Sequence, residues 1–408
     1  MQAQARELVL QGHRVTVVIP SEDKNSRSNE LPDIHEMSLA DFRDFLSTQQ
    51  FDVVHAHPLT ANQFLGYLKV CKEQEIPVIM TYHTPTLSCG RGDLLLYGRE
   101  PCDGEMRQQR CTACILQQKG LPLFVSRVLA TLPGLSIMEK IAPVGKLRSL
   151  FSIPRQVRQN RKSFQQLRRL VCHWVAVSKW VKKVLEINGV PEGSITVCRQ
   201  AFCSEAIISD LEPESFFESA GRSLKIGFVG RIHPYKGLHV LLKALHFLPT
   251  AKLEVHIVGD NSDIVPEYRL ILGEDIRNDS RVKWIGKLEP DLVTEFIRQM
   301  DVLTVPSLCM ETGPMTVLEA WAVGVPVIGT DRGGIKEWVD EYGGGWLFPA
   351  GDARALASII ENLLNKQILF PAVPTEARLF SMKTVARSMA NMYKDVVSQK
   401  KRLEKAVV

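Results

Sequence analysis

The sequence places a strand, a loop and a helix in direct succession at residues 302–322, which read VLTVPSLCMETGPMTVLEAWA. The apolar, β-branched run Val302–Val305 is typical of a buried strand. Pro314 suits the first turn of a helix, where its missing N–H costs nothing. The N-terminus of such a helix offers backbone N–H groups and a positive dipole end to an anion. The segment therefore predicts a phosphate site at the N–H groups of Met315 and Thr316.

Two glutamates accompany this helix. Glu311 precedes it and Glu319 lies inside it. The neighbours of Glu319 are all apolar: Val317, Leu318, Ala320, Trp321, Ala322 and Val323. A helix that is apolar all round is buried, and a lone carboxylate in it needs a partner. Carboxylates accept hydrogen bonds from sugar hydroxyls. We therefore favour a ligand-binding role for Glu319 over that of a solvated helix residue.

A second segment contains residues suited to ligand binding. It reads LKIGFVGRIHPYKG and occupies residues 224–237. It reads as a buried strand and a turn at Gly230, followed by a loop that carries Arg231 and Lys236. A diphosphate needs compact positive charge and closely approaching backbone, which Arg, Lys and Gly supply. On spacing alone, a surface loop with two solvated cations is an equal alternative.

Short β-branched runs alternate with helical patterns along most of the 408 residues, which predicts parallel sheets covered by helices. The strand candidates are 14–19, 52–56, 77–82, 174–177, 195–198, 224–229, 252–258, 282–285, 302–305 and 326–329. The expected parts are a first α/β domain at 1–203, a linker at 204–222, a second α/β domain at 223–370 and C-terminal helices at 371–408 that return to the first domain. Parallel sheets bind ligands at the carboxyl ends of their strands, so we expect a cleft between two facing domains.

Together these segments resemble glycosyltransferase family 4, whose members are retaining enzymes with two doubly wound, Rossmann-like domains facing a cleft (the GT-B fold). The resemblance covers about residues 224–364. It rests on the Gly-Arg-x4-Lys-Gly block, Val258-Gly259-Asp260, Pro306-Ser307, the Glu-x7-Glu stretch and Thr330-Asp331-x-Gly333-Gly334.

The resemblance also implies roles for individual residues. Arg231 and Lys236 would bind the donor diphosphate, Glu319 would contact the ribose, and Glu311 would face the transferred sugar as a catalytic candidate. The remaining donor contacts would come from Gly230, Gly313, Pro314, Met315 and Thr316. The resemblance implies retention of anomeric configuration and no cofactor requirement for catalysis, because cations and a helix N-terminus offset the leaving-group charge.

The first half places histidines at two predicted strand ends, in Asp52-Val-Val-His55-Ala-His57 and Thr81-Tyr-His83-Thr84. We expect His55 and His57 to be structural. The resemblance makes His83 a second catalytic candidate, since the family has a strand-end histidine near the donor sugar. Ser178 resembles the family too, or is simply an N-cap.

Two features depart from the family pattern. The family begins with a strand and a Gly-Gly loop, whereas this chain opens on a helical pattern at 3–11, so we expect the first domain to lack its start. The interdomain segment reads Arg199-Gln200-Ala201-Phe202 instead of the usual Asn-Gly-Ile/Val-Asp. Contacts that the family makes with these two segments are therefore in doubt.

Composition is that of a folded protein, with 45% hydrophobic and 23% charged residues. No apolar stretch is long enough for a membrane span and the N-terminus has no signal-peptide pattern, which favours the cytoplasm. The net charge of +5 does not indicate nucleic acid, but residues 140–183 hold twelve Lys or Arg and no acid. That block is either a solvated face or a peripheral contact with an anionic membrane.

Four of the nine cysteines cluster in a segment at about 85–120: Cys89, Cys102, Cys111 and Cys114. The last two form Cys-x2-Cys, one half of a common zinc motif, although the other spacings are irregular. A structural zinc, unpaired thiols, and disulfide or cluster chemistry all remain open.

The sequence thus predicts a retaining glycosyltransferase that moves a sugar from a UDP- or GDP-sugar to a glycan or lipid-linked acceptor. A catalytically impaired relative that binds nucleotide or glycan is the alternative. A dinucleotide-dependent oxidoreductase is disfavoured, because no G-x-G-x-x-G follows a strand.

Overall fold

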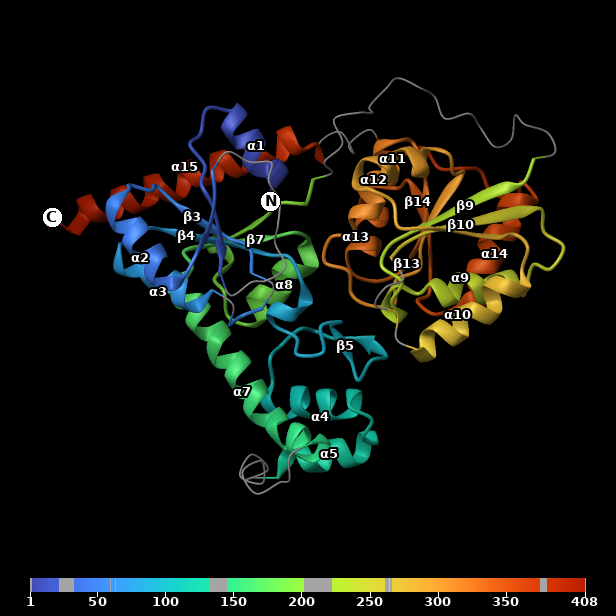
Figure 1. The fold of residues 1–408 in the computed structure, drawn as a ribbon, viewed down its shortest axis with the longest axis horizontal. Coiled ribbons are helices and arrows are strands. Elements are labelled where there is room, and N and C mark those ends of the chain that lie inside the picture. The colour runs from blue at the N-terminus through green and yellow to red at the C-terminus, as the bar shows by residue number, and fades with distance from the viewer. Residues whose placement is uncertain are drawn as a thin grey trace. The chain divides into compact units, whose positions relative to one another are not determined.

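The computed structural model describes residues 2–21, 33–58, 60–62, 64–132, 145–201, 222–260, 264, 266–374 and 380–407. The chain forms two compact units, one of residues 1–199 and 382–408 and the other of residues 200–381 (Figure 1). The predicted linker, apart from Arg222, lies outside the described residues. The two units are described separately.

The second unit is a doubly wound sheet of six parallel strands in the order β11-β10-β9-β12-β13-β14. Its elements in chain order are β9 (Leu224–Val229), the 3-10 turn η3 (Pro234–Lys236), α9 (Leu238–Leu245), β10 (Leu253–Val258), α10 (Pro266–Asn278), β11 (Val282–Gly286), α11 (Pro290–Arg298), β12 (Val302–Val305), α12 (Met315–Ala322), β13 (Val327–Thr330), α13 (Gly333–Tyr342), β14 (Gly345–Phe348) and α14 (Ala353–Leu364).

Helices cover both faces of this sheet. Helices α9, α10 and α14 share one apolar core with the sheet, and α11, α12 and α13 share another on the opposite face (Figure 1). Strands buried on both faces are mostly apolar, as in β12, where every residue is buried and Thr304 is the one polar side chain. This explains why continuous apolar runs located the central strands in the sequence.

The first unit contains a smaller parallel sheet, β3-β4-β7-β8, and a separate parallel pair, β1-β2. Its elements are α1 (Gln2–Leu10), β1 (Val17–Pro20), β2 (Ile34–Met37), α2 (Leu39–Thr48), β3 (Val54–Ala56), α3 (Leu65–Glu73), β4 (Val78–Tyr82), η1 (Pro85–Leu87), β5 (Leu95–Leu96), β6 (Glu100–Pro101), α4 (Gln108–Gln118), α5 (Leu123–Thr131), α7 (Lys146–Leu170), β7 (His173–Ala176), α8 (Lys179–Ile187), η2 (Glu192–Ser194), β8 (Ile195–Val197) and α15 (Met382–Val407).

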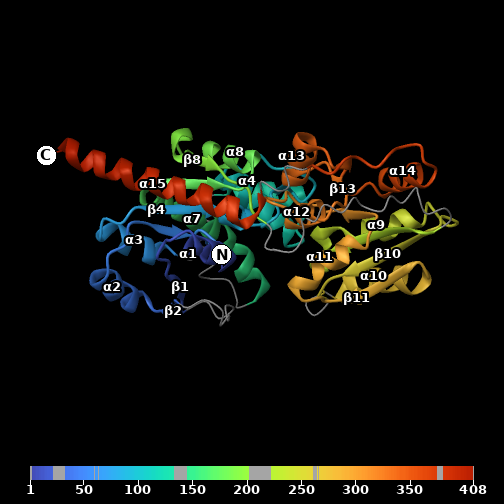
Figure 2. The ribbon, with the colours of Figure 1, turned by 90° about the horizontal axis from the view of Figure 1, so that it is seen from above.

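The C-terminal helix α15 packs along α1, far away in sequence (Figure 2). Leu8 of α1 is buried together with Ala386 and Ala390 of α15. Small residues on α15 let the two helices approach closely. In the described ranges, no helix is both long and apolar enough to span a bilayer.

Every predicted strand segment overlaps an observed strand. The sequence did not predict β2, the short β14 or the two-residue hairpin strands β5 and β6. Strand β2 reads IHEM and exposes its two central residues, so it lacks the apolar run that marks the inner strands.

Candidate functional site

The strand order of the second unit creates a switch point between β9 and β12. From β9 the chain moves outward to β10 and β11, and from β12 it moves the other way to β13 and β14. In doubly wound sheets, ligands bind at the carboxyl ends of the strands at such a point. The loops that follow β9 and β12 carry the predicted donor-site residues.

The loop after β9 is fixed against the loop after β12. Gly230 comes directly after β9, and Arg231 follows with its side chain exposed. Gly237 has φ of 73°, and any Cβ there would overlap the Pro306 carbonyl oxygen. A glycine is therefore required, and it lets the η3 turn hold Lys236 beside the end of β12.

Lys236 and Glu311 form an ion pair, with 2.7 Å between Nζ and Oε1. Ser307 Oγ also donates to Glu311 Oε1 at 2.7 Å. Burial by itself would lower the pKa of Lys236, but the Glu311 carboxylate raises it above its usual range. Burial would likewise raise the pKa of Glu311, but Lys236 and Ser307 hold it below its usual range. Both groups are therefore charged at neutral pH.

Glu319 is a half-buried carboxylate inside α12, whose residues Val317, Leu318, Ala320, Trp321 and Ala322 are buried. Burial raises the pKa of Glu319. Within the described ranges, no hydrogen bond or ion pair engages its carboxylate. The sequence predicts a partner for this carboxylate, and none of the described residues supplies one. A ligand hydroxyl could therefore donate a hydrogen bond to Glu319.

The N-terminus of α12 is held by a glycine turn at the start of α13. Pro314 is the N-cap residue, so Met315 and Thr316 open the helix. Gly333 has φ of 53°, and a Cβ there would lie 2.7 Å from the Glu311 backbone. The Gly334 N–H donates to the Glu311 carbonyl at 2.7 Å. The Gly-Gly turn thus sets the position of the loop that carries Glu311.

Gly313 lies in the same loop, and a Cβ added there would meet Gln200 Oε1 at 2.7 Å. Gln200 belongs to the interdomain segment Arg199-Gln200-Ala201-Phe202, which departs from the family pattern. The Gln200 side chain therefore reaches the loop that carries Gly313. Its contact with Gly313 was not predictable from the spacing.

In the first unit, His57 and His83 follow β3 and β4, and His57 Nδ1 lies 2.7 Å from His83 Nε2. Burial lowers the pKa of His83 to about 4 and that of His57 well below its usual value. The pair is therefore neutral at physiological pH, and one imidazole N–H donates to the other ring.

His55 is a satisfied structural residue. Its Nε2 lies 2.7 Å from Thr81 Oγ1 and its Nδ1 lies 2.7 Å from the hydroxyl of Tyr393 on α15. Burial lowers its pKa to about 3. Ser178 occupies the N-cap position of α8, but its hydroxyl makes no capping hydrogen bond.

The four clustered cysteines line one cavity of the first unit, between η1, the β5–β6 hairpin and α4. Among the residues that the structure describes, no three His, Cys, Asp or Glu side chains are already arranged as a metal-ligand set. The zinc hypothesis therefore stays a prediction, and the chemistry of this cavity is taken up below.

Two family models match the chain. The model for Glycosyltransferase Family 4 matches residues 1–102, and the model for Glycosyl transferases group 1 matches residues 223–366. The second match contains every residue that the sequence assigned to the donor site. The first contains the segment with His83.

A curated relative is the amylovoran biosynthesis glycosyltransferase AmsK of Erwinia amylovora, 30% identical over 195 residues, which are 45% of this chain and 45% of AmsK. The chain thus matches about half the length of its curated relatives. Sucrose-phosphate synthase from Thermosynechococcus elongatus shares the fold, with a TM-score of 0.64 at 15% identity over 98% of this chain and 92% of that one.

Anabaena HepE, solved in complex with UDP and glucose, also shares the fold, with a TM-score of 0.58 at 16% identity over 89% of this chain and 86% of that one. The fold class is therefore α/β with two Rossmann-like domains, as in these glycosyltransferase structures. With both family models and the similar fold, the chain belongs to the group 1 glycosyltransferases of family 4.

Proposed function

We propose that this chain is a retaining glycosyltransferase that takes a hexose from a UDP- or GDP-sugar and transfers it to a glycan or lipid-linked acceptor in polysaccharide or glycolipid synthesis. Two observations carry the proposal: the Lys236–Glu311 pair in the loops at the β9/β12 switch point, and the half-buried Glu319 on α12, which has no partner among the described residues. HepE, which has the same fold, was solved with UDP and glucose, which supports a UDP-sugar donor.

The chemistry follows from the charges at this site. Loss of the nucleoside diphosphate leaves negative charge on the β-phosphate oxygens as the glycosidic bond breaks. Arg231, Lys236 and the N–H groups at the start of α12 would stabilise that charge. Glu319 would accept hydrogen bonds from ribose hydroxyls, and Glu311 would face the sugar while keeping Lys236 in place.

We propose His83 as a catalytic residue that acts as a neutral imidazole, because burial lowers its pKa to about 4. Its Nε2 lies 2.7 Å from His57 Nδ1, which fixes the orientation of the ring. A neutral ring can donate or accept a hydrogen bond without adding a second positive charge to the site.

Nucleotide calorimetry coupled to a transfer assay tests the proposed function. We expect UDP or GDP to bind, and the matching sugar nucleotide to be turned over. His83→Ala should leave nucleotide affinity within about twofold and lower kcat by about 10²-fold or more, because His83 belongs to the sugar side of the reaction. Binding without turnover in the wild type would indicate the non-catalytic relative, and binding of neither nucleotide would contradict both.

We also propose that the first unit contacts an anionic membrane at its cytoplasmic face. Helix α7 holds eight Lys or Arg and no acid, and Arg148, Arg155, Arg158, Arg161 and Lys162 are exposed along it. Helix α5 packs with α4. Phe124 in α5 is 78% exposed, and Leu132, directly after the helix, is 50% exposed. Basic charge beside exposed apolar side chains suits a lipid surface.

Vesicle sedimentation tests this contact. Wild-type protein should sediment with phosphatidylglycerol vesicles and not with phosphatidylcholine vesicles, and added salt should weaken the binding. Arg155→Glu with Arg158→Glu should weaken binding by about tenfold or more, since each basic residue near the surface contributes ~1 kcal/mol. The matched pair Lys243→Glu and Lys252→Glu in the second unit should sediment like the wild type. Equal vesicle binding by the two double variants would contradict the proposed contact through α7.

A further inference from the structure

The segment between β4 and α4 is held together by few regular elements. It contains one short 3-10 turn and a hairpin of two-residue strands, β5 and β6. Leu94 and Tyr97 in it adopt positive φ, at 50° and 54°. Small, irregular segments of this kind usually rely on a disulfide or a metal ion, because their own core is too small.

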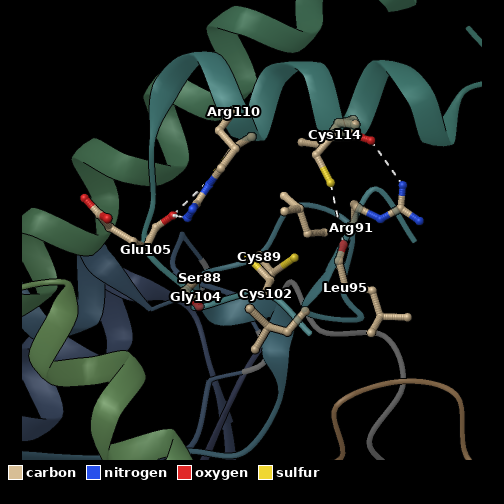
Figure 3. A pocket seen from close by; sticks show the side chains of 14 residues that line it. Ser88, Cys89, Arg91, Leu95, Cys102, Gly104, Glu105, Arg110 and Cys114 are labelled. Carbon is tan, nitrogen blue, oxygen red and sulfur yellow. Dashed lines mark hydrogen bonds between the residues drawn. The ribbon is translucent and has the colours of Figure 1, made fainter. Parts of the chain in front are cut away.

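Four thiols converge on a single cavity of about 30 Å³ in this segment. Cys89 follows η1, Cys102 follows β6, and Cys111 and Cys114 lie three residues apart on one face of α4. Figure 3 shows Cys89 and Cys102 beside each other on the loop, and Cys114 pointing from α4 toward Leu95. A cavity of this volume has room for one ion and little more.

We propose that Cys89, Cys102, Cys111 and Cys114 bind a zinc ion as four thiolates. Four cysteines from a loop, a hairpin end and a helix are a common ligand set for structural zinc, and soft thiolates select zinc among the divalent metals. This inference is independent of the proposed transferase activity, because the cysteines belong to the first unit and the donor-binding loops belong to the second.

Backbone donors around the cavity favour thiolates. The Tyr97 N–H donates to Cys114 Sγ at 3.1 Å. Such N–H···S contacts become stronger once the sulfur is charged.

The opposite contacts, from S–H to oxygen, belong to the protonated thiols. Cys102 Sγ faces Asp103 Oδ1 at 3.7 Å, Cys111 Sγ faces the Glu105 carbonyl at 3.9 Å, and Cys114 Sγ faces the Leu95 carbonyl at 3.6 Å. These contacts would be lost on deprotonation, which frees the sulfur atoms to turn toward a bound ion. Side-chain rotation toward the cavity would complete the set.

Two arginines line the cavity, and each is ion-paired with an aspartate, Arg91 with Asp93 and Arg110 with Asp103. Binding of Zn²⁺ by four thiols releases four protons and leaves a net charge of −2. Arg110 donates to the Glu105 carbonyl at 2.7 Å. Arg91 donates to the Cys114 carbonyl at 3.1 Å (Figure 3).

The ion would fix the loop that follows His83. Tyr82, at the end of β4, is buried and its hydroxyl lies 2.7 Å from Ser88 Oγ, next to Cys89. A metal bound to Cys89 would therefore tie the end of β4 to α4. Its role would be structural, because four protein thiolates leave no open position for a substrate.

Metal analysis of the full chain, purified without chelator, tests the proposal. We expect about one equivalent of zinc in the wild type and below about a tenth in Cys111→Ser/Cys114→Ser. Cys172→Ser, at an exposed cysteine outside the cavity, is the matched control and should keep the zinc.

A second measurement does not depend on the variants folding. Reduced wild-type protein stripped of metal should bind cobalt(II) with the absorption of a tetrahedral thiolate complex, and zinc should displace it. The proposal is overturned if the purified wild type holds less than a tenth of an equivalent of zinc and the stripped protein binds neither metal. It is also overturned if the four cysteines are paired as disulfides, or if iron and sulfide are found in place of zinc.

Discussion

Replacing Lys236 by alanine should lower kcat/KM for the donor by ~10²- to 10³-fold, the effect expected when one preorganised charge at a leaving group is lost. Lys236 is held beside the end of β12 by Glu311, so its charge needs no rearrangement to meet a diphosphate. Nucleotide calorimetry on the same variant should show weaker UDP or GDP binding. Steady-state kinetics with the donor identified by the nucleotide panel measure the loss.

The same substitution leaves Glu311 without its cation. Glu311 is 14% exposed, and an unpaired buried carboxylate destabilises the fold. We expect the Tm to fall by about 2–4 °C, which is roughly 1 kcal/mol for a domain of this size. Lys236→Ala/Glu311→Gln should recover the Tm but not the activity.

The control for Lys236 is Lys243→Ala, an exposed lysine on α9 of the same unit. The substitution removes one positive charge from the unit, as Lys236→Ala does, but Lys243 lies in a helix and not in the loop after β9. Wild-type turnover in Lys236→Ala would contradict the assigned site. A similar loss in Lys243→Ala would show that net charge, and not the position of Lys236, decides binding.

Glu319→Gln should raise the thermal stability of the protein while lowering the affinity for nucleotide by about tenfold or more, because a charged acceptor is lost where ribose hydroxyls bind. Burial raises the pKa of Glu319, and no group in the described ranges compensates its charge. The charged form is therefore less stable in the folded chain than in water, so a neutral side chain of the same shape should be tolerated better.

The pH dependence follows from the same shift. Because the folded chain keeps the Glu319 proton to higher pH than the unfolded chain does, stability should fall as pH rises above the ordinary pKa of 4.5 and level off above the raised value. Glu319→Gln should remove this slope. Thermal melts from pH 4 upward, with exposed Glu361→Gln of α14 as control, measure it. Lower stability together with unchanged nucleotide affinity would mean that Glu319 is structural.

The sequence alone located the strands that carry the donor site. The predictions for 224–229 and 302–305 agree with β9 and β12 residue for residue. Strands buried on both faces are mostly apolar, so their composition reveals them, although β9 includes Lys225 and β12 includes Thr304. Strand β2 exposes its two central residues and β5 is only two residues long, so neither sequence gives a comparable signal.

The sequence also indicated which kinds of binding site the protein contains. An isolated carboxylate in an apolar helix, two cations after a glycine turn and four close cysteines each identify a kind of site, since burying a polar group is costly unless it has a partner. These statements concern neighbours along the chain. They do not say which residues meet across the fold.

Only the tertiary structure decided the partners. Lys236 and Glu311 are 75 residues apart in sequence and become an ion pair because β9 and β12 are neighbours in the sheet. His57 meets His83 in the same way, through the pairing of β3 with β4. The Gly333 turn under Glu311 and the convergence of four thiols on one cavity likewise depend on packing. Local sequence sets propensity and charge, but strand order and packing set the distances on which hydrogen bonds and ion pairs depend.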